Sequence, residues 1–431
     1  MPIRLVSSSA DFDETFRRFL LTKREASADV EAAARAIVDD VASRGDAALI
    51  EATKKFDRLA LDAASLRVTP AEIEAAVREC DPATVDALKF ARDRIEAFHL
   101  RQLPQDQRFT DAAGVELGWR WSAIDAVGLY VPGGTAAYPS SVLMNAIPAK
   151  VAGVERLVMV VPAPDGKLNP LVLAAAHLGG VSEIYRVGGA QAVAALAYGT
   201  ATIAPVAKIV GPGNAYVAAA KRLVFGKVGI DMIAGPSEVL VIADDTANAE
   251  WVAADLLAQA EHDTSAQSIL ITDSHTLADD VARAVEGQLK TLPRAAIASA
   301  SWADFGAIIE VDHLDQAVPL ANALAAEHLE IMTSDPEALA AKVRNAGAIF
   351  LGGHTPEAIG DYVGGSNHVL PTARSARFSS GLGVLDFMKR TSILKCGPDQ
   401  LRALGPAAMA LGKAEGLDAH ARSVGLRLNP S

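Results

Sequence analysis

The spacing of hydrophobic residues changes along this 431-residue chain. Between residues 27 and 98, apolar side chains such as Ile73 and Val77 recur every three or four positions, with acidic and basic residues between them. This spacing places the apolar side chains on one face of a helix. We therefore predict several helices packed as a layer, preceded by a short arm at 1–25 and followed by a polar connector or hairpin at 102–120.

Short runs rich in valine and isoleucine alternate with alanine-rich stretches after residue 121. Such alternation, with short links, predicts parallel strands that are covered on both faces by helices. The predicted strands are 127–131, 157–161, 183–187, 208–210 and 239–242, and the predicted helices lie near 140–152, 169–178, 190–198 and 214–223.

The same alternation begins again after Asp244. Pro319 falls inside a predicted helix, where it removes a backbone hydrogen bond, so the pattern does not define the start of that helix. The whole chain predicts an α/β fold: two Rossmann-like parallel-sheet domains with an N-terminal helical region and a C-terminal helical tail. The predicted helices are 247–262, 276–290, 314–326, 336–345 and one near 399–415, and the predicted strands are 268–272, 307–311, 329–332 and 348–351.

Composition and charge narrow the class of protein. Half of the residues are hydrophobic and 5% are aromatic, which is typical of a helix-rich α/β enzyme. The net charge of −12 argues against nucleic acid or an anionic membrane as a partner, because both are polyanions. Cys80 and Cys396 are too few for a disulfide framework, and no run of about 18 apolar residues could span a membrane. We therefore expect a cytoplasmic protein.

Three predicted strands run into glycine at their carboxyl ends, at 128–134, 187–191 and 210–216. Ligands bind at the carboxyl ends of strands in an open parallel sheet, and glycine lets the backbone approach them closely. None of the three stretches matches G-x-G-x-x-G, and glycine at such turns also serves plain turn geometry. Dinucleotide binding and simple turns therefore both remain open for these loops.

Four metal-capable side chains are dispersed along the chain: Gln259, His262, Asp361 and His420. Neither C-x-x-C nor H-E-x-x-H occurs, so any site that these residues share must be built by tertiary or quaternary structure. Gln259 and His262 lie one turn apart at the end of an apolar helical stripe, which predicts that they face the interior or a cleft. The alternative is a histidine that interacts with the dipole of a helix C-terminus.

An adjacent carboxylate and imidazole, Glu327 and His328, join a predicted helix to an apolar strand. This pair offers a general base and a second proton carrier, although adjacent Glu and His also occur by chance on protein surfaces. The glycine-rich loop at 360–371 also concentrates polar groups after a strand, including Asp361 and His368.

Several motifs together carry a resemblance that covers essentially the whole chain. They are GLYVPGG (128–134), VGGAQAVAALAYGT (187–200), KIVGPGNAYV (208–217), IAGPSE (233–238), LLAQAEHD (256–263), AEHLEI (326–331), SNHVLP (366–371) and ARFSSGL (376–382). This combination resembles the histidinol dehydrogenase family. Members of that family oxidise L-histidinol to L-histidinal and then to L-histidine, with two NAD⁺ and one zinc ion.

The resemblance implies a role for each candidate residue. The implied zinc ligands are Gln259, His262, Asp361 and His420. The implied NAD contacts are Tyr130, Gln191 and Asn214. The implied substrate contacts are Ser237, His328, His368 and Glu415, alongside the zinc ligands. Glu327 and His328 are the implied acid/base pair, in which His328 takes the alcohol proton and Glu327 activates water on the aldehyde.

The resemblance also implies an assembly. The family is a homodimer whose tails cross to the partner, so Glu415 and His420 are expected to complete the other subunit's site. The implied division is an arm (1–25), a larger domain with the zinc and acid/base residues (26–120 with 241–380), a smaller NAD-contacting domain (121–240) and a dimerisation tail (381–431). One departure is visible, since residues 372–375 read Thr-Ala-Arg-Ser where the family pattern predicts glycines.

Two other functions fit the same residue types. A zinc hydrolase could use the ligand set and a glutamate base to activate water for attack on an amide, and it predicts no dependence on NAD. A nucleotide-binding regulatory protein with a structural zinc ion predicts no turnover.

Overall fold

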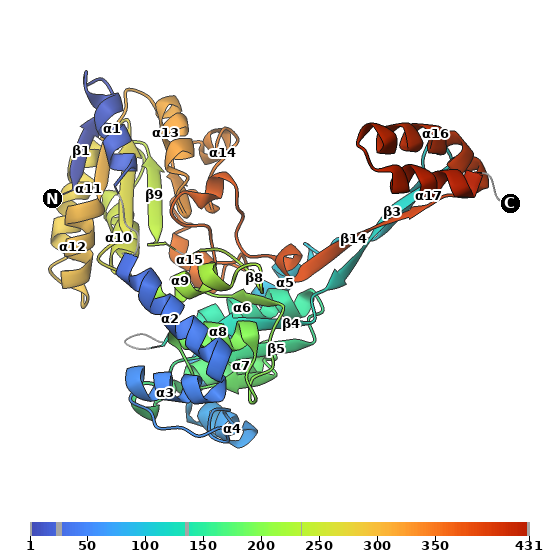
Figure 1. Cartoon of the computed structure of the whole chain (residues 1–431). Helices are drawn as coiled ribbons and strands as arrows, with labels where there is room; N and C mark the ends of the chain where they lie inside the picture. The colour runs from blue at the N-terminus through green and yellow to red at the C-terminus, as the bar shows by residue number, and fades with distance from the viewer. Residues whose placement is uncertain (1, 23–27, 134–137, 234, 429–431) are drawn as a thin grey trace.

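The computed structural model describes residues 2–22, 28–133, 138–233 and 235–428. Ser27, Gly134 and Ala234, which belong to the predicted helical layer and to two of the motifs, lie outside the described residues. Two parallel sheets with their helices form the body, and a third, antiparallel sheet extends from it (Figure 1). The mixed α/β fold with parallel sheets is confirmed.

The first parallel sheet has five strands in the order β6-β5-β4-β7-β8. Its central strand, β4, is completely buried, which explains the unbroken apolar run after Asp125. The strands are β4 (Ala126–Tyr130), β5 (Arg156–Val160), β6 (Glu183–Tyr185), β7 (Lys208–Val210) and β8 (Gly229–Ile230), and the helices that follow them are α6 (Pro139–Val151), α7 (Pro170–Gly179), α8 (Gly189–Tyr198) and α9 (Ala215–Val224).

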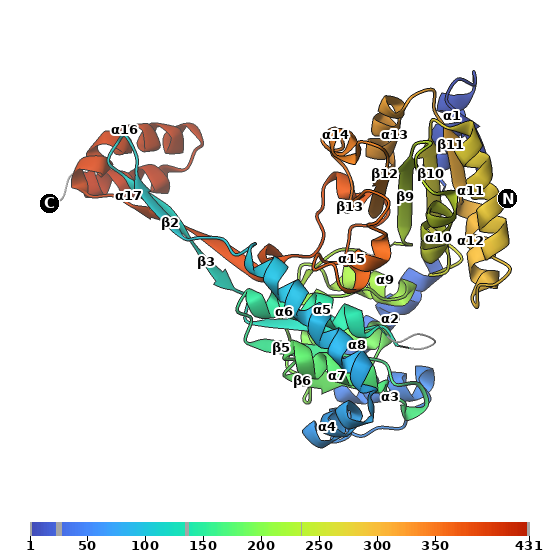
Figure 2. The same cartoon turned by 180° about the vertical axis from the view of Figure 1, so that it is seen from behind.

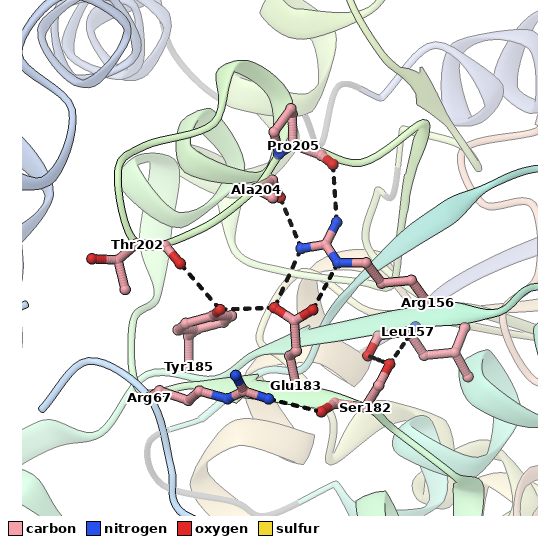
Figure 3. A network of polar contacts seen from close by, with 9 residues as sticks. All are labelled: Arg67, Arg156, Leu157, Ser182, Glu183, Tyr185, Thr202, Ala204 and Pro205. Atoms are coloured by element: carbon pink, nitrogen blue, oxygen red, sulfur yellow. Dashed lines mark hydrogen bonds and ion pairs between the residues drawn. The ribbon is translucent and has the colours of Figure 1, made fainter. Parts of the chain in front are cut away.

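An ion pair holds the amino ends of two strands in this sheet. Arg156 begins β5 and Glu183 begins β6, and their side chains pair with an Nε–Oε1 distance of 2.7 Å (Figure 3). The same guanidinium donates to the carbonyls of Ala204 and Pro205, and Glu183 also accepts from the hydroxyl of Tyr185. The network therefore ties the loop before β7 to the amino edge of the sheet.

The second parallel sheet has six strands in the order β1-β11-β10-β9-β12-β13. Its strands are β1 (Ile3–Val6), β9 (Glu238–Ala243), β10 (Gln267–Thr272), β11 (Ala307–Glu310), β12 (His328–Met332) and β13 (Ala348–Leu351). Its helices are α1 (Phe12–Leu20), α10 (Ala249–Ala260), α11 (His275–Gln288), α12 (Ala295–Phe305), α13 (Ala317–Leu324), α14 (Pro336–Ala340) and α15 (Glu357–Tyr362).

The predicted N-terminal arm is part of this second sheet. Strand β1 pairs in parallel with β11, and α1 buries Phe12, Phe16 and Phe19 in the same hydrophobic core. Four residues are too few to show a clear strand period, so the pattern of residues 1–25 did not reveal the strand.

The N-terminal helical layer packs on the five-stranded sheet. Helix α2 contacts α8 and α9, and α5 contacts α6 and α7. The predicted division joined residues 26–120 to 241–380. Helices α2 and α5, which lie within 26–120, contact helices that flank the five-stranded sheet. The layer consists of α2 (Ala28–Arg44), α3 (Asp46–Phe56), α4 (Pro70–Glu79) and α5 (Pro82–Leu100).

A C-terminal arm projects from the body, as both views show (Figures 1 and 2). The hairpin of β2 (Gln107–Thr110) and β3 (Glu116–Ala123) pairs with β14 (Met388–Lys395), which runs antiparallel to β3. At the far end, α16 (Pro398–Ala414) packs against α17 (Asp418–Leu428). The predicted hairpin and the helix near 399–415 are present, whereas β14 and α17 were not predicted.

Two predicted helix boundaries differ in the structure. The helix predicted at 247–262 ends at Ala260, so His262 lies in the turn that follows it. The helix predicted at 314–326 is a 3₁₀ turn (Leu314–Gln316) followed by α13. Pro319 is the third residue of α13, where a helical N–H has no partner within the helix. Among the helices described, none is long and apolar enough to cross a membrane.

Candidate active site

The predicted acid/base pair lies at the amino end of β12. Glu327 precedes the strand and His328 begins it, and both side chains are buried. A carboxylate oxygen of Glu327 accepts a hydrogen bond of 3.1 Å from the backbone N–H of Glu238. His328 places Nδ1 3.2 Å from the carbonyl oxygen of Glu238, so the neighbouring strand β9 orients both members of the pair.

Two further carboxylates surround the imidazole of His328. Glu357 places Oε2 3.6 Å from Nδ1, and Asp361 places Oδ1 3.5 Å from Nε2. Both acids belong to α15, one turn apart, and Figures 1 and 2 show α15 on the side of the six-stranded sheet that faces the five-stranded one. Asp361 was predicted in a loop, but it lies in this short helix. Nothing in the local pattern around Glu357 singled it out.

Burial dominates the electrostatics of these groups. It raises the pKa of Glu327 to about 7 and that of Glu357 to about 8, because an ionised carboxylate is poorly solvated there. Burial alone would lower the pKa of His328, yet the surrounding carboxylates, Glu357 foremost, raise it well above its ordinary value. Burial also opposes ionisation of Asp361, but its ion pair with His328 keeps the pKa of Asp361 below the usual range.

His368 connects the two parallel sheets at this point. Its Nδ1 lies 2.8 Å from the carbonyl oxygen of Asp361, and its Nε2 lies 3.2 Å from the hydroxyl of Ser141 on α6. The neighbouring Asn367 donates to the carbonyl of Met144, also on α6. The site is therefore bounded by helices of both sheets.

His262 lies within electrostatic range of the carboxylate of Asp361, and Gln259 lies one turn before His262. The imidazole of His262 lowers the pKa of Asp361, although hydrogen bonding to His328 is the larger effect. Gln259 is completely buried, and neither polar atom of its amide has a hydrogen-bond partner among the described residues. His262 places Nδ1 2.9 Å from the carbonyl oxygen of Ala258, so Nε2 is the ring nitrogen that can bind a metal ion.

These side chains fit a zinc site, because an unpaired buried amide, an imidazole and a carboxylate offer donor atoms that Zn²⁺ accepts. In the part of the chain that is described, no group of three or more His, Cys, Asp or Glu is placed to hold a metal. His420 and Glu415 are exposed on the C-terminal arm, which projects away from α10, the helix that contains Gln259 (Figure 1). One chain by itself therefore does not bring the four predicted ligands together.

The three residues predicted to contact NAD lie along the carboxyl edge of the five-stranded sheet. Tyr130 ends β4 and accepts a hydrogen bond of 3.0 Å from the backbone N–H of Gly189, and burial raises its pKa to about 12. Gln191 is buried in the first turn of α8. Asn214 caps α9, since its side-chain oxygen accepts from the N–H groups of Tyr216 and Val217.

Residues 372–375, where the sequence departs from the family pattern, include two residues with positive φ. Ala373 and Arg374 have φ values of 51° and 61°, in the left-handed region that favours glycine. Thr372 accepts a hydrogen bond of 2.6 Å from the N–H of Gly235, two residues before the half-buried Ser237. Ala373 and Arg374 therefore adopt here, without glycine, the backbone conformation that favours glycine.

A buried cluster of carboxylates and imidazoles between two parallel sheets is typical of the functional site of an α/β enzyme. The sequence model of the histidinol dehydrogenase family matches residues 21–428. The chain is 83% identical to histidinol dehydrogenase of Bradyrhizobium diazoefficiens and 81% identical to that of Rhodopseudomonas palustris, with full coverage of each chain. A crystal structure of histidinol dehydrogenase from Elizabethkingia anophelis superposes with a TM-score of 0.94 at 37% identity, covering 99% of this chain and 97% of that one. The chain belongs to the histidinol dehydrogenase family and is an oxidoreductase.

Proposed function

We propose that this protein oxidises L-histidinol through L-histidinal to L-histidine, with two NAD⁺ and one zinc ion, as the last steps of histidine biosynthesis in the cytoplasm. The observation that carries the proposal is the convergence of Glu327, His328, Asp361 and His368 at one place between the two sheets. Both oxidations require proton transfer, and this cluster supplies a base and an acid within one buried space.

The zinc ion is assigned to Gln259, His262 and Asp361 of one chain and His420 of the partner subunit. The unpaired, buried amide of Gln259 supports this assignment, because a buried polar group without a partner is unfavourable unless a ligand satisfies it. Zn²⁺, when bound, supplies a Lewis acid that anchors nitrogen atoms of the substrate. Ser237, His368 and Glu415 are proposed to contact the substrate beside these ligands.

Each member of the acid/base pair is assigned to one of the two oxidations. In its neutral form, His328 donates Nδ1–H to the carbonyl of Glu238, so Nε2 is the nitrogen that takes the alcohol proton of histidinol in the first oxidation. Glu327 activates water for addition to the aldehyde in the second, and its raised pKa of about 7 makes its carboxylate a stronger base than an exposed one. Glu327 and His328 are both buried, so an aldehyde that stays bound beside them between the two steps is protected from side reactions.

NAD⁺ is assigned to the carboxyl edge of the five-stranded sheet, at Tyr130, Gln191 and Asn214. In chain order, the strands of this sheet lie third, second, first, fourth, fifth, which is the order of a Rossmann-like dinucleotide-binding sheet. The order reverses between β4 and β7, and Tyr130 ends β4 while Asn214 lies in the turn that follows β7. The strands β9 to β13 repeat the same order in the other sheet, which supports two Rossmann-like domains.

The position of the C-terminal arm supports a homodimer with shared sites. Glu415 and His420 lie at the end of α16 and in α17, on an arm that projects away from the body of the chain (Figure 2), and this position supports their assignment to a site of another chain. Several leucines on this arm are largely exposed, which supports burial against a second copy. They are Leu394, Leu404, Leu411, Leu417 and Leu426.

One assay tests the proposal against its two rivals. The protein is incubated with limiting L-histidinol and excess NAD⁺, and reduced cofactor is followed by absorbance. We expect two NADH per histidinol, with activity abolished by a chelator and restored by zinc. A zinc hydrolase predicts no NADH, and a regulatory nucleotide-binding protein predicts no turnover. A yield of one NADH or none would overturn the proposal.

A further inference from the structure

A buried ion pair lies behind the strand edge that is assigned to NAD⁺. Lys221 is in the second turn of α9 and Asp231 follows β8, and their side chains form an ion pair and are 2% and 1% exposed. Charges this deeply buried are poor evidence for added stability, because desolvation offsets much of their attraction. Stabilisation of the fold by itself therefore does not explain this ion pair.

Both partners bind the same glycine. The ammonium group of Lys221 donates to the carbonyl of Gly211 at 3.0 Å, and Asp231 accepts a hydrogen bond of 2.8 Å from the N–H of Gly211. The polar groups of this one residue are thus both held by the ion pair. Asp231 is itself held in place, because its own N–H donates to the carbonyl of Ile209 on β7.

Gly211 is also packed tightly on its other side. It has φ of 107°, and a Cβ atom built on it would lie 2.2 Å from the carbonyl oxygen of Tyr130. The turn that begins at Gly211 leads to Asn214, which caps α9, the helix that carries Lys221. Gly211 therefore lies between Tyr130 and the ion pair, in the turn that sets the position of Asn214.

We propose that Lys221 and Asp231 are positioning residues for the dinucleotide, which fix the Gly211 turn and with it the placement of Asn214 relative to Tyr130. The inference rests on the proposed NAD⁺ site and adds two residues to it. Neither residue is proposed to touch NAD⁺, since both side chains are buried beneath the turn. Their loss should weaken NAD⁺ binding while leaving the histidinol contacts in place.

The test is Lys221→Met in the full-length protein, with steady-state kinetics for both substrates and calorimetric titration of NAD⁺. We expect KM and Kd for NAD⁺ to rise roughly tenfold or more, with KM for histidinol changed less than about twofold. Glu183→Gln is the matched control, because it breaks a partly buried ion pair at the opposite edge of the same sheet. It should lower stability and leave both KM values unchanged.

A second variant keeps the test decisive if Lys221→Met does not fold. In Lys221→Met/Asp231→Asn both charges are removed, and the asparagine can still accept from Gly211, so folding is retained while the carbonyl contact is lost. KM for NAD⁺ should remain raised in this protein. Wild-type KM for NAD⁺ in the folded variants, or equal rises for both substrates, would overturn the inference. Wild-type protein that neither binds nor reduces NAD⁺ would instead overturn the proposed function, and the inference with it.

Discussion

His328 Nε2 lies 3.5 Å from Asp361 Oδ1, which couples the first residue of β12 to the short helix α15. This contact joins the proposed acid/base pair to a proposed zinc ligand. The imidazole therefore has a carboxylate on each side, because Glu357 lies 3.6 Å from its other nitrogen. Substitutions in this cluster should therefore affect the two oxidations, metal binding and folding to different extents.

Glu327→Gln should separate the two oxidations. We expect oxidation of histidinal to fall by about 10²- to 10⁴-fold, because the base that activates water is lost, while some oxidation of histidinol to the aldehyde remains. Single-turnover measurements started from each substrate check this. Glu330→Gln, which alters another buried acid on the same strand, is the control and should spare the second oxidation. Equal loss of both steps in Glu327→Gln would contradict the role of Glu327.

The second oxidation should depend on pH through Glu327. Its pKa is raised to about 7, so the carboxylate form is lost below that value, and the rate should fall about tenfold per pH unit there. The effect of Glu327 on folding stability has the opposite direction. Folding favours the protonated form of Glu327, so its stabilising contribution is fully present below pH 4.5 and is lost as pH rises through about 7. A pH–rate profile for histidinal, compared with Glu327→Gln, tests the effect on rate, and urea unfolding of both proteins over the same pH range tests the effect on stability. A rate that stays flat from pH 6 to pH 8 would argue against Glu327 as the base.

Gln259→Leu should uncouple metal binding from folding. Its buried amide has no hydrogen-bond partner among the residues described, so leucine should raise the metal-free unfolding free energy by about 1 kcal/mol. Zinc content after dialysis should fall at the same time. Gln267→Leu is the control, because the amide of Gln267 is also buried but donates to the carbonyl of Phe305, so that change should destabilise the protein. Full zinc content in Gln259→Leu would remove Gln259 from the ligand set.

Shared sites should allow complementation between subunits. We expect His420→Ala and His262→Ala proteins to be inactive separately and to recover activity after mixing, because a mixed dimer has one site with both histidines intact. Refolding the two together and measuring NADH formation checks this, with each protein refolded alone as the control. Confirmed mixed dimers without activity would show that each chain completes its own site.

Glu183→Gln should weaken the fold in a pH-dependent manner. Pairing with Arg156 lowers the pKa of Glu183, so its stabilising contribution is present above the unfolded value near 4.5 and is lost as pH falls through the lower folded value. At pH 7 the variant should lose about 1–2 kcal/mol in urea unfolding, and the difference should shrink toward pH 3. An unchanged difference at low pH would show that the ion pair is not its source.

Much of the fold was predictable, because strands buried on both faces leave unbroken apolar runs. Strand β4 and its neighbours in the five-stranded sheet were found in this way, and the glycines after β4 and β7 marked the edge where Tyr130 and Asn214 lie. Strand β1 was missed because its partner, β11, lies some three hundred residues away and four residues carry little period. Strand β14 is largely exposed, so it also lacked an apolar run.

The sequence by itself determined the family, the α/β class and the identity of the candidate residues, since all of these are encoded in local motifs and spacing. Only the tertiary structure decided which of them meet. It placed Glu357 beside His328, held Gly211 between Lys221 and Asp231, and placed the helix that contains His420, α17, on an arm that projects away from α10. Such contacts join residues from different strands and helices, and their distances depend on how whole elements pack, which no local pattern specifies.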